Sequence, residues 1–457
     1  MNPKVTVYIT NFNYGQYLEK AIKSVLDQTV QDFELLIIDD GSTDNSMDVI
    51  KRFEEIENVY VVVQKNKGLN VSNNIAIRMS RGEFIMRLDA DDYLDVRCLE
   101  IMISEMERQS NLALVFPDYF KIDENGEILN QVRRHDFKND VTLLDQPAHG
   151  ACTMIRKRIL EEVGGYDESF NKQDGYDLWL KIIDRYKVSN INLPLFYYRK
   201  HGTSLSSDDG ELLKTRAEIK KKRVQEKNVE PISVLAVIPT RGSRMDPRSL
   251  PMRKLGGKHL IDSTIESAFS SELLSNILVT TPDSNVIHHI RNKYGDRITI
   301  VDRSEELARI NMGFQSTIVD AVIKFEDNHP SPDAVMVLNI ESPFKSTLYI
   351  EKAIHTLQLF EVSCVKSVII DDGFFYEHDG SGLRSRVSNG LLRLERDSLY
   401  REAGGITLYD RSVINDDKLP ERNIGHVVVD QKSSFKIESD LDWKIAESIM
   451  DENCKVL

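Results

Sequence analysis

The chain has 457 residues, of which 41% are hydrophobic and 29% charged, a composition typical of a soluble protein with two or three folded domains. Its formal net charge of −14 argues against a general nucleic-acid binder, which is usually basic. No apolar run approaches the ~18 residues of a membrane span, and no signal peptide is visible. The four cysteines lack metal-ligand spacing, so we expect reduced thiols in a cytoplasmic protein.

Strands and helices alternate in the first half of the chain. The hydrophobic pattern predicts these elements, in order: strand Val5–Thr10, helix Gln16–Gln28, strand Phe33–Ile38, helix Asp44–Glu55, strand Val59–Gln64, helix Asn70–Ser80 and strand Phe84–Leu88. Such alternation predicts an α/β fold with a mixed, mostly parallel sheet and helices on both faces.

A charged segment, Asp208–Glu230, interrupts this pattern and ends before Pro231. We predict a linker helix there whose basic run, 216–223, forms a solvated face, with phosphate binding as the alternative. Alternation then restarts with these elements: strand Ser233–Ile238, helix Leu260–Phe269, strand Asn276–Thr280 and strand Ala334–Asn339. The predicted organisation is therefore a domain at 1–207, a linker at 208–231 and a second α/β domain at 232–457.

Carboxylates follow two predicted strands of the first half, at Asp39-Asp40 and at Asp89-Ala90-Asp91-Asp92. In open α/β sheets ligands bind outside the carboxyl ends of the strands. A hard divalent cation prefers oxygen ligands, typically one or two carboxylates together with substrate phosphates. Turn and helix-cap chemistry is the alternative for either motif alone, but two such motifs about fifty residues apart favour a nucleotide and metal site.

The N-terminal half resembles the family 2 glycosyltransferases. The motifs that carry the resemblance span roughly residues 4–207, in the family's order: VTVYITNFN (5–13), LIIDDGSTD (36–44), LDADD (88–92), GGYD (164–167), QDGYDLWL (173–180) and YRKH (198–201). The resemblance implies a Rossmann-like nucleotide-diphospho-sugar transferase fold and inverting sugar transfer from a nucleotide-sugar donor.

The same resemblance implies roles for individual residues. Asp39 would contact the base or ribose, Asp89 the ribose or a metal-bound water, and Asp91 would bind Mg²⁺ or Mn²⁺ against the diphosphate. Further donor or substrate contacts are expected at Thr10, Asp40 and His201. A metal at this position stabilises the charge that develops on the leaving diphosphate.

Inversion also needs a base that takes the proton of the acceptor hydroxyl. We expect Asp174 in this role and Asp177 as second choice, because the chain departs here from the family's usual Glu-Asp, and Asp177 could simply cap its helix. A second departure is Ser72-Asn73-Asn74, where many members have Ala-Arg-Asn. Since that arginine is absent, Lys65, Lys67 or His201 could bind phosphate in its place.

The C-terminal half resembles the cytidylyltransferases that make CMP-activated sugar acids, such as the acylneuraminate and Kdo cytidylyltransferases. The resemblance covers about residues 232–450 and rests on these segments: VIPTRGSR (237–244), LPMRK (250–254), GKHLI (257–261), RSEELA (303–308), LNIESPFK (338–345), YREAGGI (400–406) and IESDLDW (437–443). It implies catalytic cations Arg241 and Lys254 and a further triphosphate contact at Arg253. It also implies a substrate contact at Asn339 and Mg²⁺ ligands Glu438 and Asp440.

This half departs from the family pattern at four places, two of which are a shorter interval between Arg253 and Lys258 and Glu438 in place of the usual first Asp. The loop Thr240–Arg244 lacks one glycine, and Glu341 puts a carboxylate where a neutral residue is usual, close to an anionic substrate. The leading hypothesis is a bifunctional enzyme of bacterial surface-glycan synthesis, in which one half transfers a sugar and the other activates a sialic-type or Kdo-like acid with CTP. The alternatives are an active transferase joined to a non-catalytic binding or dimerisation module, and an active cytidylyltransferase joined to an inactive transferase.

The hypothesis implies a set of partners. We expect a nucleotide-sugar donor, CTP, a sugar acid and a glycan or lipid-linked glycan acceptor, with Mg²⁺ or Mn²⁺ as cofactor and no nucleic acid. A lipid-linked acceptor would bring the cytoplasmic chain to the inner face of the membrane as a peripheral protein. A homodimer is carried over from the cytidylyltransferases.

Overall fold

The structure of the chain is a computed structural model. It describes these residues: 2–132, 150–170, 172–201, 209–242, 246, 249–309, 314–371, 373, 375–385, 399–414 and 423–451. Contacts divide the chain into two compact units. Unit 1 comprises Met1–Asp208 with Asp372–Asp397, and unit 2 comprises Asp209–Asp371 with Ser398–Leu457.

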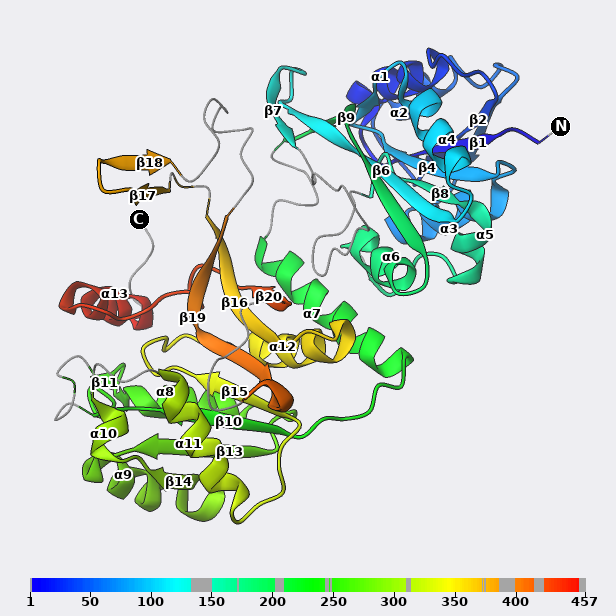
Figure 1. Cartoon of the computed structure of the whole chain (residues 1–457). Helices are drawn as coiled ribbons and strands as arrows, with labels where there is room; N and C mark the ends of the chain where they lie inside the picture. The colour runs from blue at the N-terminus through cyan, green and yellow to red at the C-terminus, as the bar shows by residue number, and fades with distance from the viewer. Residues whose placement is uncertain are drawn as a thin grey trace. The chain divides into compact units, whose positions relative to one another are not determined.

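Unit 1 is an α/β unit (Figure 1). Its elements are β1 (Val5–Asn11), α1 (Gly15–Leu26), β2 (Phe33–Asp39), α2 (Ser46–Ile50), β3 (Val59–Val63), α3 (Leu69–Met79), β4 (Phe84–Asp89), β5 (Tyr93–Leu94), α4 (Cys98–Arg108), β6 (Leu112–Ile122), β7 (Ile128–Val132), β8 (Met154–Arg156), α5 (Lys157–Glu162), α6 (Asp174–Ile183), β9 (Lys187–Arg199) and the hairpin β17 (Tyr376–His378) and β18 (Leu383–Ser385).

The large sheet of unit 1 has the strand order β3-β2-β1-β4-β8-β6-β9-β5, with β7 paired to β6. The first four strands are parallel, and β8 joins β4 in antiparallel orientation. Every residue of β2 is buried, so both faces of this part of the sheet are covered. Register places Asp39 opposite Asn11 and Asp89 opposite Thr10, so the two carboxylates flank the end of β1.

Unit 2 repeats this class of architecture. Its elements are α7 (Asp209–Glu226), β10 (Val234–Pro239), β11 (Lys254–Leu255), β12 (Lys258–His259), α8 (Leu260–Phe269), β13 (Asn276–Thr281), α9 (Ser284–Tyr294), η1 (Gly295–Arg297), β14 (Thr299–Asp302), α10 (Glu305–Ala308), α11 (Phe314–Glu326), β15 (Ala334–Leu338), α12 (Thr347–Phe360), β16 (Cys364–Asp371), β19 (Leu399–Asp410), η3 (Arg411–Val413), β20 (Ile424–Val428) and α13 (Asp440–Met450).

The main sheet of unit 2 runs β14-β13-β10-β15-β19-β16-β20. Its first four strands are parallel, in the same third-second-first-fourth order as those of unit 1, and β19 then turns antiparallel. Apolar side chains of α11, among them Ile318, Val322 and Phe325, pack with those of β10 and β15 in one hydrophobic core. The predicted fold class, two α/β units with mixed and largely parallel sheets, is confirmed.

Two predicted helices differ from the structure. The helix expected over 44–55 is only the short α2, because Asp44 uses its carboxylate to bind the Gly15 and Ser46 N–H groups and the residues after Ile50 form turns. The helix expected to be a solvated linker packs against α12 in unit 2. Lys220 of its basic run is fully buried and donates to Thr356 Oγ1 at 2.8 Å, so the prediction of a solvated face is wrong at this residue.

Within the described ranges, no helix combines the length and apolarity needed to cross a bilayer. The sequence also favours a helical segment near Asp140–Asp145 that would help shape an acceptor site, but these residues lie outside the described ranges, as do Ser243 and Arg244 of the loop Thr240–Arg244.

Candidate functional site

The carboxylate of Asp39 is fixed at the end of β2. It is fully buried and accepts one hydrogen bond from Asn11 Nδ2 at 2.7 Å and another from the Ser42 backbone N–H at 2.9 Å. Asn11 Nδ2 also lies 3.0 Å from Ser42 Oγ, so β1, β2 and the following turn are tied together. Thr10, one residue earlier on β1, pairs in register with Asp89. The structure thus brings three of the predicted donor-site residues to one edge of the sheet.

Asp40 has a different environment from Asp39. Its two carboxylate oxygens accept the Lys67 and Gly68 backbone N–H groups at 2.8 Å each, and Gln64 Nε2 donates at 2.7 Å. These bonds hold the loop between β3 and α3. Ser72, a departure from the family pattern, joins the same network by accepting from Gln64 Nε2 at 3.0 Å. Asp40 therefore shapes this loop through contacts within the chain.

Arg87 contacts two of the predicted site residues, Asp89 and Asp174. Its guanidinium is only 5% exposed, and its Nε lies 2.9 Å from Asp89 Oδ1 while Nη2 lies 3.3 Å from Asp89 Oδ2. Nη1 donates to Asp174 Oδ2. Burial raises the pKa of Asp89 to about 6; Arg87 opposes the rise, and the charges of Asp91 and Asp174 add to it. Two carboxylates that sequence places 85 residues apart thus share one buried cation.

Asp91 pairs with His201 at the other side of this cluster. His201 Nε2 lies 2.9 Å from Asp91 Oδ2, and the imidazole packs on Tyr14 and Tyr17 with ring centroids at 5.5 and 5.9 Å. Burial raises the pKa of Tyr14 to about 12, and the negative charge of Asp91 adds to the effect. Arg199 donates from Nε to the Asp91 carbonyl at 2.9 Å, which fixes the turn that carries the carboxylate.

The position of Asp174 depends on the segment before α6. Asn70 of α3 donates from Nδ2 to the carbonyls of Asp167 and Phe170, both at 2.7 Å. Asn74, one turn further on, donates to the Tyr166 carbonyl and accepts the Tyr166 N–H, both at 2.9 Å. Asp174 then begins α6 with a side chain that is 12% exposed.

Asp177 lies one turn further into α6 and is buried. Its carboxylate contacts Lys181 at 2.7 Å, within the same helix, rather than Arg87. Of the two candidate bases, Asp174 is the one in contact with the cluster of Asp89. Asn73, at the position of the family's arginine, is fully buried, and within the described residues its amide has no hydrogen-bond partner. Lys65 and Lys67 are exposed.

The donor atoms at Asp91 and His201 fit a divalent cation. A carboxylate oxygen and an imidazole nitrogen converge at 2.9 Å. Two such groups leave coordination positions for phosphate oxygens, the usual arrangement for Mg²⁺ and Mn²⁺ at a diphosphate. Among the described side chains, no cluster of three or more His, Cys, Asp or Glu residues is placed to hold a metal ion. A cation at this site would therefore depend on substrate oxygens for the rest of its coordination.

The corresponding edge of unit 2 is basic. Arg241 follows β10, and its Nη1 lies 3.6 Å from Asp246 Oδ2. Burial lowers the pKa of Arg303 to about 10, and the neighbouring positive charge of Arg241 adds to the shift. Gly242 has a φ of +77°, and a Cβ there would lie 2.2 Å from Asp283 Oδ2, so a side chain at this position would be strained and would displace Asp283. Two adjacent arginines at strand ends favour an anionic ligand.

A buried lysine organises the turn after β15. Lys345 Nζ donates to the carbonyl of Asn339 at 2.5 Å and to that of Ser342. Burial lowers the pKa of Lys345 to about 7, against the opposing charge of Glu341. The Glu341 carbonyl accepts the N–H of Ile437 at 2.8 Å, directly before Glu438. The predicted substrate and metal residues Asn339 and Glu438 are thus held by one turn.

The remaining predicted residues of unit 2 meet at the start of α13. Arg253 lies over the Trp443 ring at 3.8 Å, and its Nη1 is 3.7 Å from Asp440 Oδ1. Asp440 is 96% exposed, and Glu438 is exposed and pairs with Lys436 at 2.5 Å. Lys254 is exposed on the β11 hairpin, next to Arg253 in the chain. The two predicted metal ligands lie near the basic residues, yet neither is buried.

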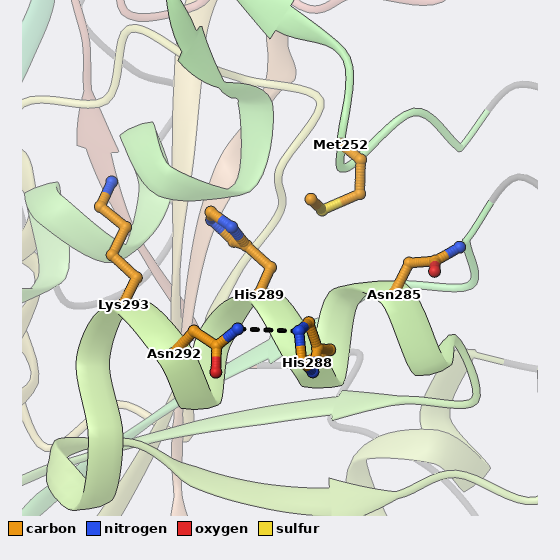
Figure 2. Close-up of a pocket in the computed structure, with 6 residues that line it drawn as sticks. All are labelled: Met252, Asn285, His288, His289, Asn292 and Lys293. Atoms are coloured by element: carbon orange, nitrogen blue, oxygen red, sulfur yellow. Dashed lines mark hydrogen bonds between the residues drawn. The ribbon is translucent and has the colours of Figure 1, made fainter.

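Unit 2 also has a surface pocket that sequence analysis did not predict (Figure 2). It measures about 510 Å³ and is lined by Met252, Asn285, His288, His289, Asn292 and Lys293. Behind it, buried Asp262 of α8 accepts from Tyr294 Oη and pairs with His289 Nε2 and Lys293 Nζ, each at 2.8 Å. None of the predicted site residues lines this pocket.

Three residues with central positions at these sheet edges were not predicted from sequence: Arg87, Arg303 and Lys345. A signal existed for Arg87, because it is a charged residue inside the apolar strand Phe84–Asp89. Arg303 and Lys345 each lie within a quoted segment, but their burial could not be anticipated without the structure.

Comparison with known proteins identifies a family match in the N-terminal region. Residues 6–164 match the model of the family described as glycosyl transferase family 2, which confirms the resemblance predicted for this half. The chain is 29% identical over 205 residues to chondroitin synthase of Escherichia coli, covering 45% of this chain and 30% of that protein. It is 28% identical over 228 residues to hyaluronan synthase of Pasteurella multocida, covering 50% of this chain and 22% of that protein.

Two solved structures are more distant. S. aureus TarS 1-349 in complex with UDP-GlcNAc is 19% identical with a TM-score of 0.40, covering 48% of this chain and 66% of that one. The 4-diphosphocytidyl-2C-methyl-D-erythritolsynthase of Anaerococcus prevotii is 15% identical with a TM-score of 0.39, covering 49% and 97%. Likenesses at this level assign no ligand. The resemblance of the C-terminal half to cytidylyltransferases stays a prediction.

Proposed function

We propose that unit 1 transfers a sugar, with inversion, from a nucleotide-diphosphate sugar to a glycan acceptor. The observation that carries the proposal is the single cluster formed by Asp89, Arg87 and Asp174 beside the Asp91–His201 pair. Two relatives are named chondroitin synthase and hyaluronan synthase, which supports a polysaccharide as the acceptor to test first.

Each residue has a role in this proposal. Asp39 and Asp89 bind the nucleoside, while Asp91 and His201 hold the Mg²⁺ or Mn²⁺ that neutralises charge on the leaving diphosphate. Thr10 lines the donor site beside Asp89. The acceptor hydroxyl attacks the anomeric carbon, its proton passes to the Asp174 carboxylate, and the nucleoside diphosphate leaves from the opposite face. Asp177 remains the second candidate for the base.

The test is donor turnover by the full-length protein. Nucleoside diphosphate release would be followed with a panel of nucleotide-diphosphate sugars, with Mn²⁺ or Mg²⁺ and then with a chelator. We expect release with at least one donor, loss of release with the chelator, and an inverted anomer in the product. A folded protein that neither binds nor cleaves any donor would refute the proposal.

We further propose that unit 2 activates a sialic-type or Kdo-like sugar acid with CTP. The acid's anomeric hydroxyl would attack the α-phosphate, and pyrophosphate would leave. Arg241 and Arg253 would contact the triphosphate, Lys254 would neutralise developing charge, Asn339 would contact substrate, and Glu438 with Asp440 would bind Mg²⁺. The adjacent Arg241 and Arg303 support an anionic ligand at this edge.

One observation favours the alternative of a non-catalytic binding or dimerisation module. Glu438 and Asp440 are exposed and lie beside cations, and among the described residues they belong to no group of three or more His, Cys, Asp or Glu that could hold a metal. Pyrophosphate release from CTP with N-acetylneuraminate, legionaminate, pseudaminate, Kdn and Kdo would decide, with Glu438→Ala/Asp440→Ala as control. Release with one acid that the double variant abolishes supports the enzyme, whereas CTP binding without release supports the module.

Three expectations complete the proposal. The domain boundaries at 207/208 and 231/232, a homodimer, and peripheral association with the inner membrane face through a lipid-linked acceptor are all retained as proposals. Sedimentation of the purified chain alone, and with vesicles that carry such an acceptor, tests the last two.

A further inference from the structure

The guanidinium of Arg87 is the only described cation in contact with both Asp89 and Asp174. Asp89 ends β4, and Asp174 begins α6, so their separation is not set by any continuous element. Arg87 presents Nε and Nη2 to Asp89 and Nη1 to Asp174. Because the guanidinium is planar and rigid, its two edges fix the spacing and orientation of the two carboxylates.

The surroundings of Arg87 hold the guanidinium in place. Tyr8 is its register partner on β1, and the hydroxyl of Tyr8 lies 3.4 Å from that of Tyr166, which begins the segment leading to α6. The backbone of Gly150 also lies close to the guanidinium of Arg87. A Cβ at Gly150 would lie 2.6 Å from Nη2 and 3.1 Å from Cζ of Arg87, whereas its backbone φ is one that any residue can adopt.

We propose that Arg87 is a positioning residue for sugar transfer, which sets the place of the Asp174 base relative to the donor bound at Asp89, and that Gly150 is small because a side chain there would displace the guanidinium. The inference rests on the proposed function of unit 1. In-line displacement requires base and leaving group on opposite faces of the anomeric carbon, and small misplacements of a reacting group cost large factors in rate.

Three variants separate positioning from stability. Arg87→Met removes the link, Arg87→Lys keeps the charge but reaches one carboxylate at a time, and Gly150→Ala leaves Arg87 chemically intact while crowding it. Arg156→Lys is the matched control, since Arg156 is a buried arginine of the same sheet that binds Glu83 and the carbonyls of Leu112 and Met106. Arg156 touches none of the site carboxylates.

We expect kcat to fall by about 100-fold or more in Arg87→Met and by about tenfold in Gly150→Ala, with the donor KM changed less than kcat. Arg87→Lys should recover part of the activity. The decisive test is the double variant Gly150→Ala/Arg87→Lys: the smaller ammonium leaves room for the methyl, so the alanine should cost little in that background. Arg156→Lys should lower the melting temperature without lowering kcat.

Wild-type kcat in Gly150→Ala, or an equal cost of the alanine in both backgrounds, would overturn the inference. A second measurement, a double-mutant cycle on the unfolding equilibrium, tests the contact even if the protein shows no turnover. If the unfolding constants of Arg87→Met, Asp174→Asn and their double variant combine as independent factors, the contact does not hold Asp174, and the inference fails by itself. If the variants are coupled but the wild type cleaves no donor, the catalytic role falls together with the proposed function.

Discussion

The two units present opposite chemistry on the same topology. In both, four parallel strands run in the same order, and the candidate residues lie at the carboxyl ends of three of them: β1, β2 and β4 in unit 1, and β10, β14 and β15 in unit 2. In unit 1 these ends carry buried or half-buried carboxylates held by Asn11 and Arg87. In unit 2 they carry arginines and a buried lysine, and the candidate metal ligands are exposed. Under the proposed functions, the shared topology would place both nucleotide sites at the carboxyl ends of the strands, while the side chains would decide how the phosphates are neutralised.

The largest expected effect tests the carboxylate side of this comparison. Asp91→Ala should lower donor turnover by about 1,000-fold or more, because it removes the proposed metal ligand and the partner of His201. The measurement is nucleoside diphosphate release in the presence of Mn²⁺, together with thermal unfolding. Asp48→Asn, an exposed carboxylate on α2, serves as the control and should be unchanged. Turnover in Asp91→Ala near that of the wild type would remove the metal role from this residue.

The strand-end carboxylates of unit 1 could be predicted from sequence, because parallel register brings the ends of β2 and β4 to either side of β1. The Arg87–Asp174 contact could not, since it joins residues from a strand and a distant helix whose approach depends on Asn70 and Asn74. Strands β5–β9, which add antiparallel pairs and the parallel pair β6–β9 to the sheet, were also missed. Their pairing is set by long-range contacts rather than by local pattern.

Unit 2 allowed less to be predicted. The basic loop and the strand β10 that leads into it follow from sequence, but the burial of Lys345 and the exposure of Asp440 depend on how α13 and the turn after β15 pack. The prediction of a solvated face on α7 was wrong at Lys220 for a related reason. A lysine can be buried when its ammonium finds a partner such as Thr356 Oγ1, which composition does not show.

The next prediction concerns a carboxylate away from the ligand edges. Asp262→Ala should destabilise unit 2 by about 3 kcal/mol, because it leaves His289, Lys293 and Tyr294 without their shared buried acceptor. Chemical denaturation would measure the loss. Donor turnover by unit 1 should stay unchanged, and a parallel fall in that turnover would show that stability in unit 2 controls the activity of unit 1.

A pH effect distinguishes the edge of unit 2 from that of unit 1. The folded pKa of Lys345, about 7, lies below the unfolded value near 10.4, so between these values the unfolded state binds more protons. Stability should therefore rise with pH across this window, by up to about 1.4 kcal/mol per unit, and the penalty for burial is complete below pH 7. Lys345→Met should flatten the slope in denaturant titrations between pH 7 and 10. An equal slope in both proteins would assign the dependence to another group.

The smallest expected effect tests whether CTP binding depends on the conformation of the basic loop around Gly242 in unit 2. Gly242→Ala places a methyl against the Asp283 carboxylate at a left-handed backbone angle, which should cost about 1 kcal/mol of stability. If the loop binds a triphosphate, CTP affinity should fall by more than this strain alone explains, since Arg241 would move with the loop. CTP titration of the variant and the wild type, with Gly382→Ala as a control in open space, measures the difference. Equal CTP affinity in variant and wild type would place any triphosphate site elsewhere, leaving the carboxylate edge of unit 1 as the one nucleotide site proposed for the chain.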